Sequence, residues 1–226
     1  MTGSSATRKA IIVLSVGLLC AGAWVGWREA LPYFTGGIED AERFAALAEK
    51  VPLPGPSIAS ERLVLDNCVR TISSLYGRLQ PSVRKAAVNS NCLKAADAIV
   101  KQSPSSSYAW YVGALTSQLT HDTAGMNARL LQSQQTGPTE QWIAELRVSL
   151  AEDHLADLTP EVRANHDRDL SMLVATVRGI ASIAERYIGQ ADFRDRITAI
   201  VETMPEDDQR RFVSQVGAEA QRAVGG

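Results

Sequence analysis

The sequence predicts an all-α protein, with one N-terminal transmembrane helix followed by an antiparallel array of helices. The run from Ala10 to Trp27 carries no charge, and most segments after Glu61 repeat their apolar residues with the period of about 3.6 of an α-helix. Strand-like alternation is almost absent. We therefore divide the chain into a cytoplasmic tail (1–9), a transmembrane anchor (10–27), a juxtamembrane helix with a proline-rich linker (28–60) and an all-α repeat-like domain (61–226).

The apolar run has the length and flanks of a membrane anchor. As an α-helix it covers about 27 Å, close to the thickness of the hydrocarbon core. Arg8 and Lys9 precede it, and Trp24 and Trp27 lie at its far end, where indoles favour the membrane interface. The positive-inside rule places the tail in the cytoplasm and residues 28–226 outside it.

A cleaved signal peptide is the alternative to a retained anchor. Ala21, Gly22 and Ala23 supply the small residues that a signal peptidase requires. The apolar run continues to Trp27, however, which favours retention.

Helices are expected along the rest of the chain. Pro32–Gly37 is turn-like, Ile38–Lys50 is amphipathic, and residues 51–60 contain three prolines, which a helix interior does not accommodate. Later helices are predicted on the stripes Leu65–Leu79 and Cys92–Val100, over Tyr108–Leu119, Ala124–Gln135 and Glu140–Glu152, from Thr159 as N-cap to Tyr187, and over Asp192–Met204 and Glu206–Ala220.

Two cysteines on apolar helical stripes, Cys68 and Cys92, are candidates for a disulfide. A cysteine on such a stripe is most often a small core residue. Outside the cytoplasm, however, oxidation is permitted, and a hairpin turning near Pro81 would bring the two to the same level. We predict a Cys68–Cys92 disulfide, unless the second helix breaks at Asn89–Asn91 and shifts the register.

The sequence contains no motif for catalysis, for a cofactor or for a metal. A net charge of −2, from 23 basic and 25 acidic residues, argues against nucleic-acid binding. His154 and His166 lack the neighbours of a zinc site, so we interpret them as solvated or helix-end residues. Adjacent acids such as Glu152 and Asp153 are interpreted as solvated helix ends.

A faint internal repeat spans residues 104–138. Pro104 and Pro138 are 34 positions apart, which is the tetratricopeptide period, and Trp110 then falls on the aromatic fourth position. Ala114, Ser117 and Met126 depart from the motif, however. The segment 104–138 resembles one degenerate tetratricopeptide repeat, and a generic antiparallel helix bundle is the alternative.

A wider resemblance covers residues 90–216. Its motifs are Tyr108-Ala109-Trp110, the segment 137–143 with Arg147, the helix start 158–163, and Phe212-Val213 after Pro205. With the anchor, the chain resembles the tetratricopeptide-like accessory proteins of bacterial surface-polysaccharide synthesis, the VpsP-type family. The resemblance implies an inner-membrane protein with a periplasmic domain that assists exopolysaccharide or capsule synthesis alongside membrane-protein partners. It assigns no catalytic residue.

The expected function is therefore that of a membrane-anchored scaffold or assembly factor. Tyr108, Trp110, Tyr111 and Trp142 are candidates for lining a binding groove, although Trp110 and Trp142 are more typical of core residues that pack between helices. Two alternatives stay open: an extracytoplasmic enzyme that acts on envelope glycans, and a component of another envelope or secretion apparatus. A pocket with two facing acids would favour the enzyme.

Overall fold

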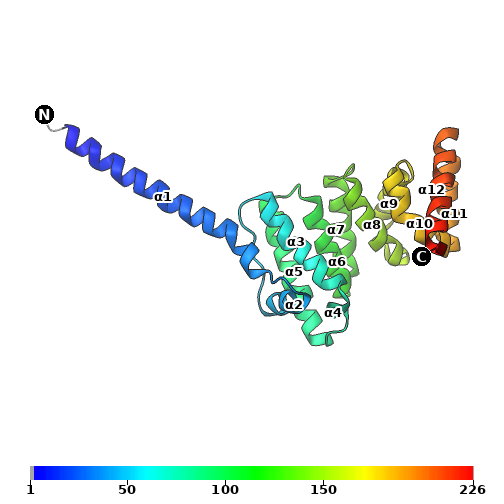
Figure 1. Cartoon of the computed structure of the whole chain (residues 1–226), viewed down its shortest axis with the longest axis horizontal. Coiled ribbons are helices and arrows are strands. Elements are labelled where there is room, and N and C mark those ends of the chain that lie inside the picture. The colour runs from blue at the N-terminus through cyan, green and yellow to red at the C-terminus, as the bar shows by residue number, and fades with distance from the viewer. Residues whose placement is uncertain (1–2, 226) are drawn as a thin grey trace. The chain divides into compact units, whose positions relative to one another are not determined.

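A computed structural model describes residues 3–225, and these residues form helices and no strand (Figure 1). This confirms the all-α prediction. The chain divides into two compact units, residues 1–102 and 103–226. Unit 1 contains α1 (Gly3–Thr35), α2 (Asp40–Glu49), α3 (Ile58–Ser73), α4 (Leu75–Arg78) and α5 (Ser82–Gln102). Unit 2 contains α6 (Ser107–Leu119), α7 (Thr123–Thr136), α8 (Gln141–Asp153), a 3-10 turn (Leu155–Asp157), α9 (Pro160–Val174), α10 (Val177–Gly189), α11 (Ala191–Glu202) and α12 (Glu206–Gly225).

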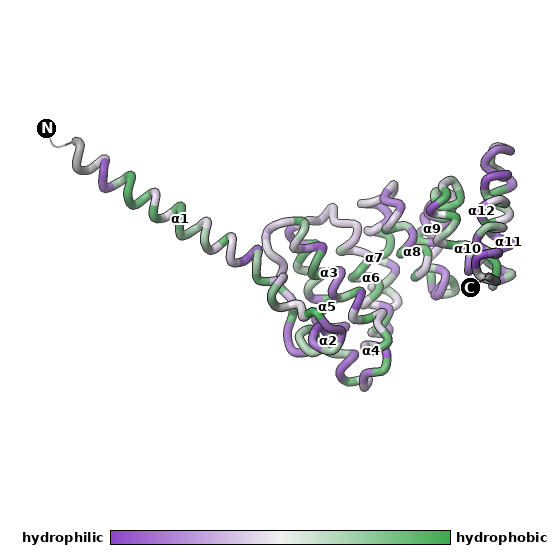
Figure 2. Tube along the Cα trace, in the orientation of Figure 1, coloured by the Kyte–Doolittle hydropathy of each residue, from purple (hydrophilic) through white to green (hydrophobic). Residues whose placement is uncertain are grey.

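Helix α1 is longer than the predicted anchor. Within it, Thr7–Phe34 is long and apolar enough to cross a membrane, and none of its most apolar window is buried. Figure 2 shows the largely hydrophobic colouring of this projecting helix. The turn expected at Pro32 does not form, because a proline in the last turn removes only one helical hydrogen bond. The chain turns instead at Gly37, whose φ is +71°.

The proline-rich segment is packed into unit 1 and does not act as a free linker. Pro54 and Gly55 are buried, and the Gly55 amide donates to Ser60 Oγ at 2.6 Å. The Ser57 amide donates to Glu29 Oε2 at 3.1 Å, which ties the segment to α1. The division between the two compact units falls after Gln102, whereas the boundary predicted from the sequence lies at residue 60.

The core of unit 1 lies between α2, α3 and α5. Helix α5 runs through Asn89–Asn91 without a break, and Asn91 Nδ2 donates to the Leu47 carbonyl of α2 at 2.9 Å. The hairpin register on which the predicted disulfide depends is therefore kept. The buried apolar residues of this core are Phe44, Leu47, Val64, Leu65, Cys68, Val88, Cys92, Ala95, Ala96 and Ile99.

Unit 2 is built from antiparallel helix pairs. Helix α6 packs against α7, and α8 against α9, where Arg147 meets Asp169 and Glu152 meets His166. The long helix predicted from Thr159 to Tyr187 is two helices, because the Thr176 side chain caps a new start by accepting from the Gly179 amide at 3.0 Å. Its main core contains Ala144, Val148, Leu170, Leu173, Val174, Ile180, Ile183, Phe193, Ile197, Val201 and Phe212.

Candidate binding cleft

An open cleft of about 470 Å³ lies between α8 and α10. Val148 and Ile183 form its apolar floor, and each is less than 5% exposed. Hydroxyl, amide, carboxylate and guanidinium groups surround this floor. The complete lining is Glu145, Val148, Ser149, Ser182, Ile183, Glu185, Arg186, Gly189 and Gln190. In ligand-binding sites an apolar lining supplies contact area, and a few polar groups fix the orientation of the ligand.

Two ion pairs connect α8 to α10. Glu145 accepts from Arg178 at 3.0 and 3.2 Å, and Asp153 accepts from Arg186 at 2.5 Å. Each pair joins residues 33 positions apart, so the two helices run parallel in one register. Arg178 is 73% exposed, and an exposed pair of this kind contributes little to stability. The ion pairs therefore show how α8 and α10 are aligned. The two helices are held together mainly by their buried apolar residues, which belong to the core of unit 2.

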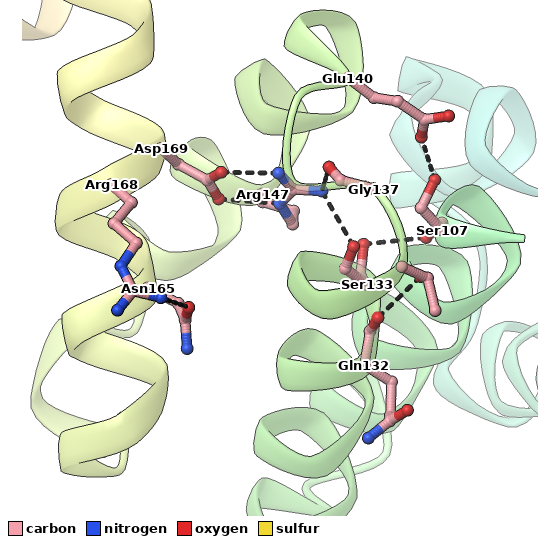
Figure 3. A network of polar contacts seen from close by, with 10 residues as sticks. Ser107, Gln132, Ser133, Gly137, Glu140, Arg147, Asn165, Arg168 and Asp169 are labelled. Carbon is pink, nitrogen blue, oxygen red and sulfur yellow. Dashed lines mark hydrogen bonds and ion pairs between the residues drawn. The ribbon is translucent and has the colours of Figure 1, made fainter. Parts of the chain in front are cut away.

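Arg147 fixes the other side of α8 through a buried network (Figure 3). Its guanidinium donates to both Asp169 oxygens, at 2.8 and 2.6 Å, and to the carbonyls of Ser133 and Gly137 at 3.2 Å. Ser133 Oγ in turn donates to the Ser107 carbonyl at 2.8 Å. Arg147 has no exposed surface, so one side chain joins α8, α9 and the end of α7 in the interior.

A second buried network lies one turn further along α8. The Glu152 carboxylate is 2% exposed, contacts His166 Nε2 of α9 at 2.6 Å and accepts from Arg196 of α11. His166 Nδ1 has no hydrogen-bond partner in the described part of the chain, so Nε2 makes the polar contact of this ring. The interpretation of Glu152 and His166 as solvated residues is therefore wrong, because helix packing places both side chains inside unit 2.

The four aromatic residues predicted to line a groove contact one another or the adjacent backbone. The rings of Tyr108 and Tyr111 are stacked at 6.3 Å, and Trp142 approaches Tyr108 edge-on at 4.9 Å. Trp110 donates its indole N–H to the Pro104 carbonyl at 2.8 Å. Burial, and secondarily the negative charge of Asp153, raise the pKa of Tyr111 to about 12. None of the four lines the α8–α10 cleft.

Cys68 and Cys92 are joined by a disulfide in unit 1. Their Cα atoms lie 5.8 Å apart, and neither side chain is exposed. The separation is within the usual range for disulfides, so the bond forms without displacing α3 from α5. Cys20, on α1, is exposed and unpaired.

Glu145 and Glu185 are the two acids of the cleft lining. Glu145 is held by Arg178 and by Gln141, whose amide donates to it at 3.1 Å. In the register set by the two ion pairs, Glu185 of α10 stands opposite Glu152 of α8. Glu152 lies seven residues after Glu145, so the backbone positions of Glu145 and Glu185 are offset by about 10 Å along the helix axes. Within residues 3–225, no three His, Cys, Asp or Glu side chains gather as metal ligands.

Comparison of the chain with protein-family models, curated proteins and solved structures finds no match. The structure defines the chain as an all-α protein in which, over the described residues, one N-terminal helix is able to span a membrane.

Proposed function

We propose that this chain is a single-pass membrane protein whose helical array binds an extended segment of a partner, as a scaffold or assembly factor. The α8–α10 cleft carries the proposal. It is open, it has an apolar floor and a polar rim, and one of its walls, α8, is joined to α9 by two buried ion pairs. Such a cleft accepts a chain without a change of fold, because its walls are already positioned.

A degenerate tetratricopeptide architecture supports this interpretation. The first helices of successive pairs, α6, α8 and α10, begin at Ser107, Gln141 and Val177, close to the repeat period of 34. Because α8 and α10 run parallel, the cleft lies between the first helices of neighbouring repeats. Stacked helix pairs generate extended concave surfaces that bind elongated partners.

The membrane location rests on α1 and on the disulfide. Arg8 and Lys9 precede the apolar span, and a buried disulfide fits an oxidising compartment. We therefore place the N-terminus in the cytoplasm of a bacterium, α1 in its inner membrane and both helical units in the periplasm.

The resemblance to the VpsP-type family suggests surface-polysaccharide synthesis or export as the process. An anchored array stays near its membrane-protein partners, and this proximity raises their effective concentration. The proposed role is therefore to hold a membrane component of that system in place, with no chemical step assigned to this chain.

Fusion of topology reporters after Gly226 tests the location. A reporter active only outside the cytoplasm should be active there, and a reporter active only in the cytoplasm should be silent. The reverse pattern would reject both the periplasmic location and the proposed function.

Filling the cleft tests the site. Ser182 lies on the rim and is exposed, so Ser182→Trp should block the cleft and leave the core intact. Ser171→Trp on α9 is the matched control, since Ser171 is exposed and lies outside the cleft lining. Surface polysaccharide should fall when the gene is deleted and when Ser182→Trp replaces it, and stay normal with Ser171→Trp. Normal polysaccharide after deletion would reject the process, whereas normal polysaccharide with Ser182→Trp alone would reject the cleft.

A further inference from the structure

A second surface, separate from the cleft, lies at the turn between α3 and α5. We call residues 75–85 the tip. Leu75, Leu79 and Val83 are 66%, 74% and 80% exposed, and Tyr76 beside them is 37% exposed. Single exposed apolar residues are common, but four large ones in nine consecutive positions are typical of a contact surface.

The tip is also positively charged. Arg78, Arg84 and Lys85 form no ion pair within the described part of the chain, and the sequence from residue 67 to residue 96 contains no acid. Arg84 bonds only Gln80 Oε1 and lies over the Phe44 ring, and Lys85 donates to the Arg78 carbonyl at 3.4 Å. Because the whole chain has a net charge of −2, this concentration of unpaired positive charge is local.

Two acids of α2, the helix packed beside α4, bond to residues of their own segment. Asp40 is paired with Arg43 at 2.8 Å, and Glu42 accepts from the Ile38 amide at 3.2 Å. Among the described residues of unit 1, no ion pair joins an acid to Arg78, Arg84 or Lys85.

The tip is held rigidly. The Cys68–Cys92 disulfide closes the loop that contains every tip residue. Tyr76 packs edge-on against Phe44 at 5.9 Å, and the Ser74 side chain caps α4 by accepting from the Gly77 amide at 3.0 Å. Gly77 fits so closely that a Cβ there would lie 1.9 Å from the Thr71 carbonyl oxygen. A fixed surface loses little conformational entropy when it binds.

With α1 as the membrane anchor proposed above, the tip lies at the end of unit 1 that is remote from the membrane. Glu29 of α1 contacts Ser57 at the start of α3, and Gly36 lies against Asn67 further along, so the two helices run in the same direction. From Ser57 to Ser73, α3 rises about 24 Å beyond the level of Glu29. Figure 1 shows α4 at the end of unit 1 opposite the entry of α1. This distance is about three Debye lengths at physiological ionic strength, so the potential of the anchoring bilayer is screened there.

We propose that the tip docks an acidic, amphipathic segment of a partner protein in the same compartment. Apolar residues of that segment would cover Leu75, Leu79 and Val83, and its carboxylates would pair with the three basic side chains. A second copy bound through the same tip fits less well, since a two-fold contact would bring two positively charged surfaces together.

Binding of a defined peptide by the full chain tests the proposal. The protein is placed in nanodiscs of uncharged lipid, and the probe is a fluorescent helical peptide with leucine on one face and glutamate on the other. A peptide with lysine in place of glutamate is the control. The glutamate peptide should bind, and both the R78E/K85E variant and Leu79→Ser should weaken it by about tenfold or more. Lys94→Glu, an exposed charge reversal on α5 outside the tip, should leave binding unchanged.

Several outcomes would overturn the proposal. Equal binding of the two peptides, no binding of either, or full binding by R78E/K85E would show that the tip does not recognise acidic segments. Flotation with phosphatidylglycerol vesicles that is lost in the same variants would assign the tip to a lipid surface. Dimers of the wild-type chain that dissociate on Leu79→Ser would assign it to a second copy. The cleft variant Ser182→Trp should bind the peptide normally, which separates this test from that of the cleft.

Discussion

The guanidinium of Arg147 and the carboxylate of Asp169 form a bidentate ion pair in the interior of unit 2, at 2.6 and 2.8 Å. The Arg147 side chain is 0% exposed and that of Asp169 is 5% exposed. Two charges in such a place lose their hydration, so each depends on the other for compensation. The carbonyls of Ser133 and Gly137 accept further bonds from the same guanidinium.

Removal of one partner should therefore destabilise the protein strongly. We expect Arg147→Met to lower the free energy of unfolding by about 3–5 kcal/mol, because Asp169 is left as a buried, uncompensated charge. Urea denaturation of residues 28–226, which lack the anchor predicted over 10–27, measures this loss. Arg178→Met is the matched control, since that arginine is 73% exposed and its pair should contribute about 0–1 kcal/mol.

The double variant R147M/D169L separates the charge from the packing. With both charges gone, we expect recovery of much of the lost stability, because no unpaired charge is left inside. A double variant as unstable as Arg147→Met would show that packing volume, and not charge compensation, is what Arg147 supplies.

Much of the fold could be predicted from the sequence because it is encoded locally. Apolar periodicity predicted most helices. Thr159 and Pro160 predicted the start of α9, and the equal spacing of Cys68 and Cys92 from residue 80, beside Pro81, predicted the hairpin of unit 1. The break at Thr176 was missed, since a threonine between two apolar stripes is compatible with a continuous helix until packing selects the cap. The anchoring of residues 51–57 by Glu29 was missed because it joins positions 28 apart.

The candidate site could be predicted much less well. The cleft exists because α8 and α10 are aligned in parallel, and that alignment is a tertiary property. One signal was present: Arg147 stands within the apolar stripe of Ala144, Val148 and Ala151, where a charge requires a buried partner. The candidate partners were Asp169 and other acids of the next helix, and only the helix register selects among them.

The turn before α4 leaves no room for a side chain at Gly77. A Cβ there would lie 1.9 Å from the Thr71 carbonyl oxygen, which is backbone and cannot rotate away. We expect Gly77→Ala to destabilise residues 28–226 by about 1–3 kcal/mol in urea denaturation. Gly217 of α12 has no neighbour within 4 Å, so Gly217→Ala should stabilise by about 0.5–1 kcal/mol. Equal effects of the two substitutions would contradict the close approach at Gly77.

Stability should fall in alkali because of Tyr111. Its pKa is raised to about 12 in the folded protein, mainly by burial, against 10.0 for an unperturbed tyrosine. The folded state therefore holds the proton more tightly, and stability present below pH 10 is lost as the pH rises through 12. The full shift of about two units corresponds to about 3 kcal/mol. Unfolding free energies measured between pH 9 and 12 should decline less steeply for Tyr111→Phe. Parallel curves for the two proteins would contradict the buried environment of the hydroxyl.

The disulfide should contribute measurably to unit 1. It joins positions 24 apart, and the chain-entropy model assigns such a loop about 3.5 kcal/mol. Since domain stabilities are about 5–15 kcal/mol, reduction of residues 28–226 should lower the melting temperature by several degrees. Replacement of both cysteines by alanine should do the same, with an added loss from the emptied core, so reduction of the native protein is the cleaner comparison.

Thiol counting on residues 28–226, denatured without reductant, decides whether the bond forms in the cell, since Cys68 and Cys92 are the two cysteines after residue 27. We expect no free thiol. Two free thiols would show that the cysteines act as small core residues, and would remove the disulfide as support for a periplasmic location.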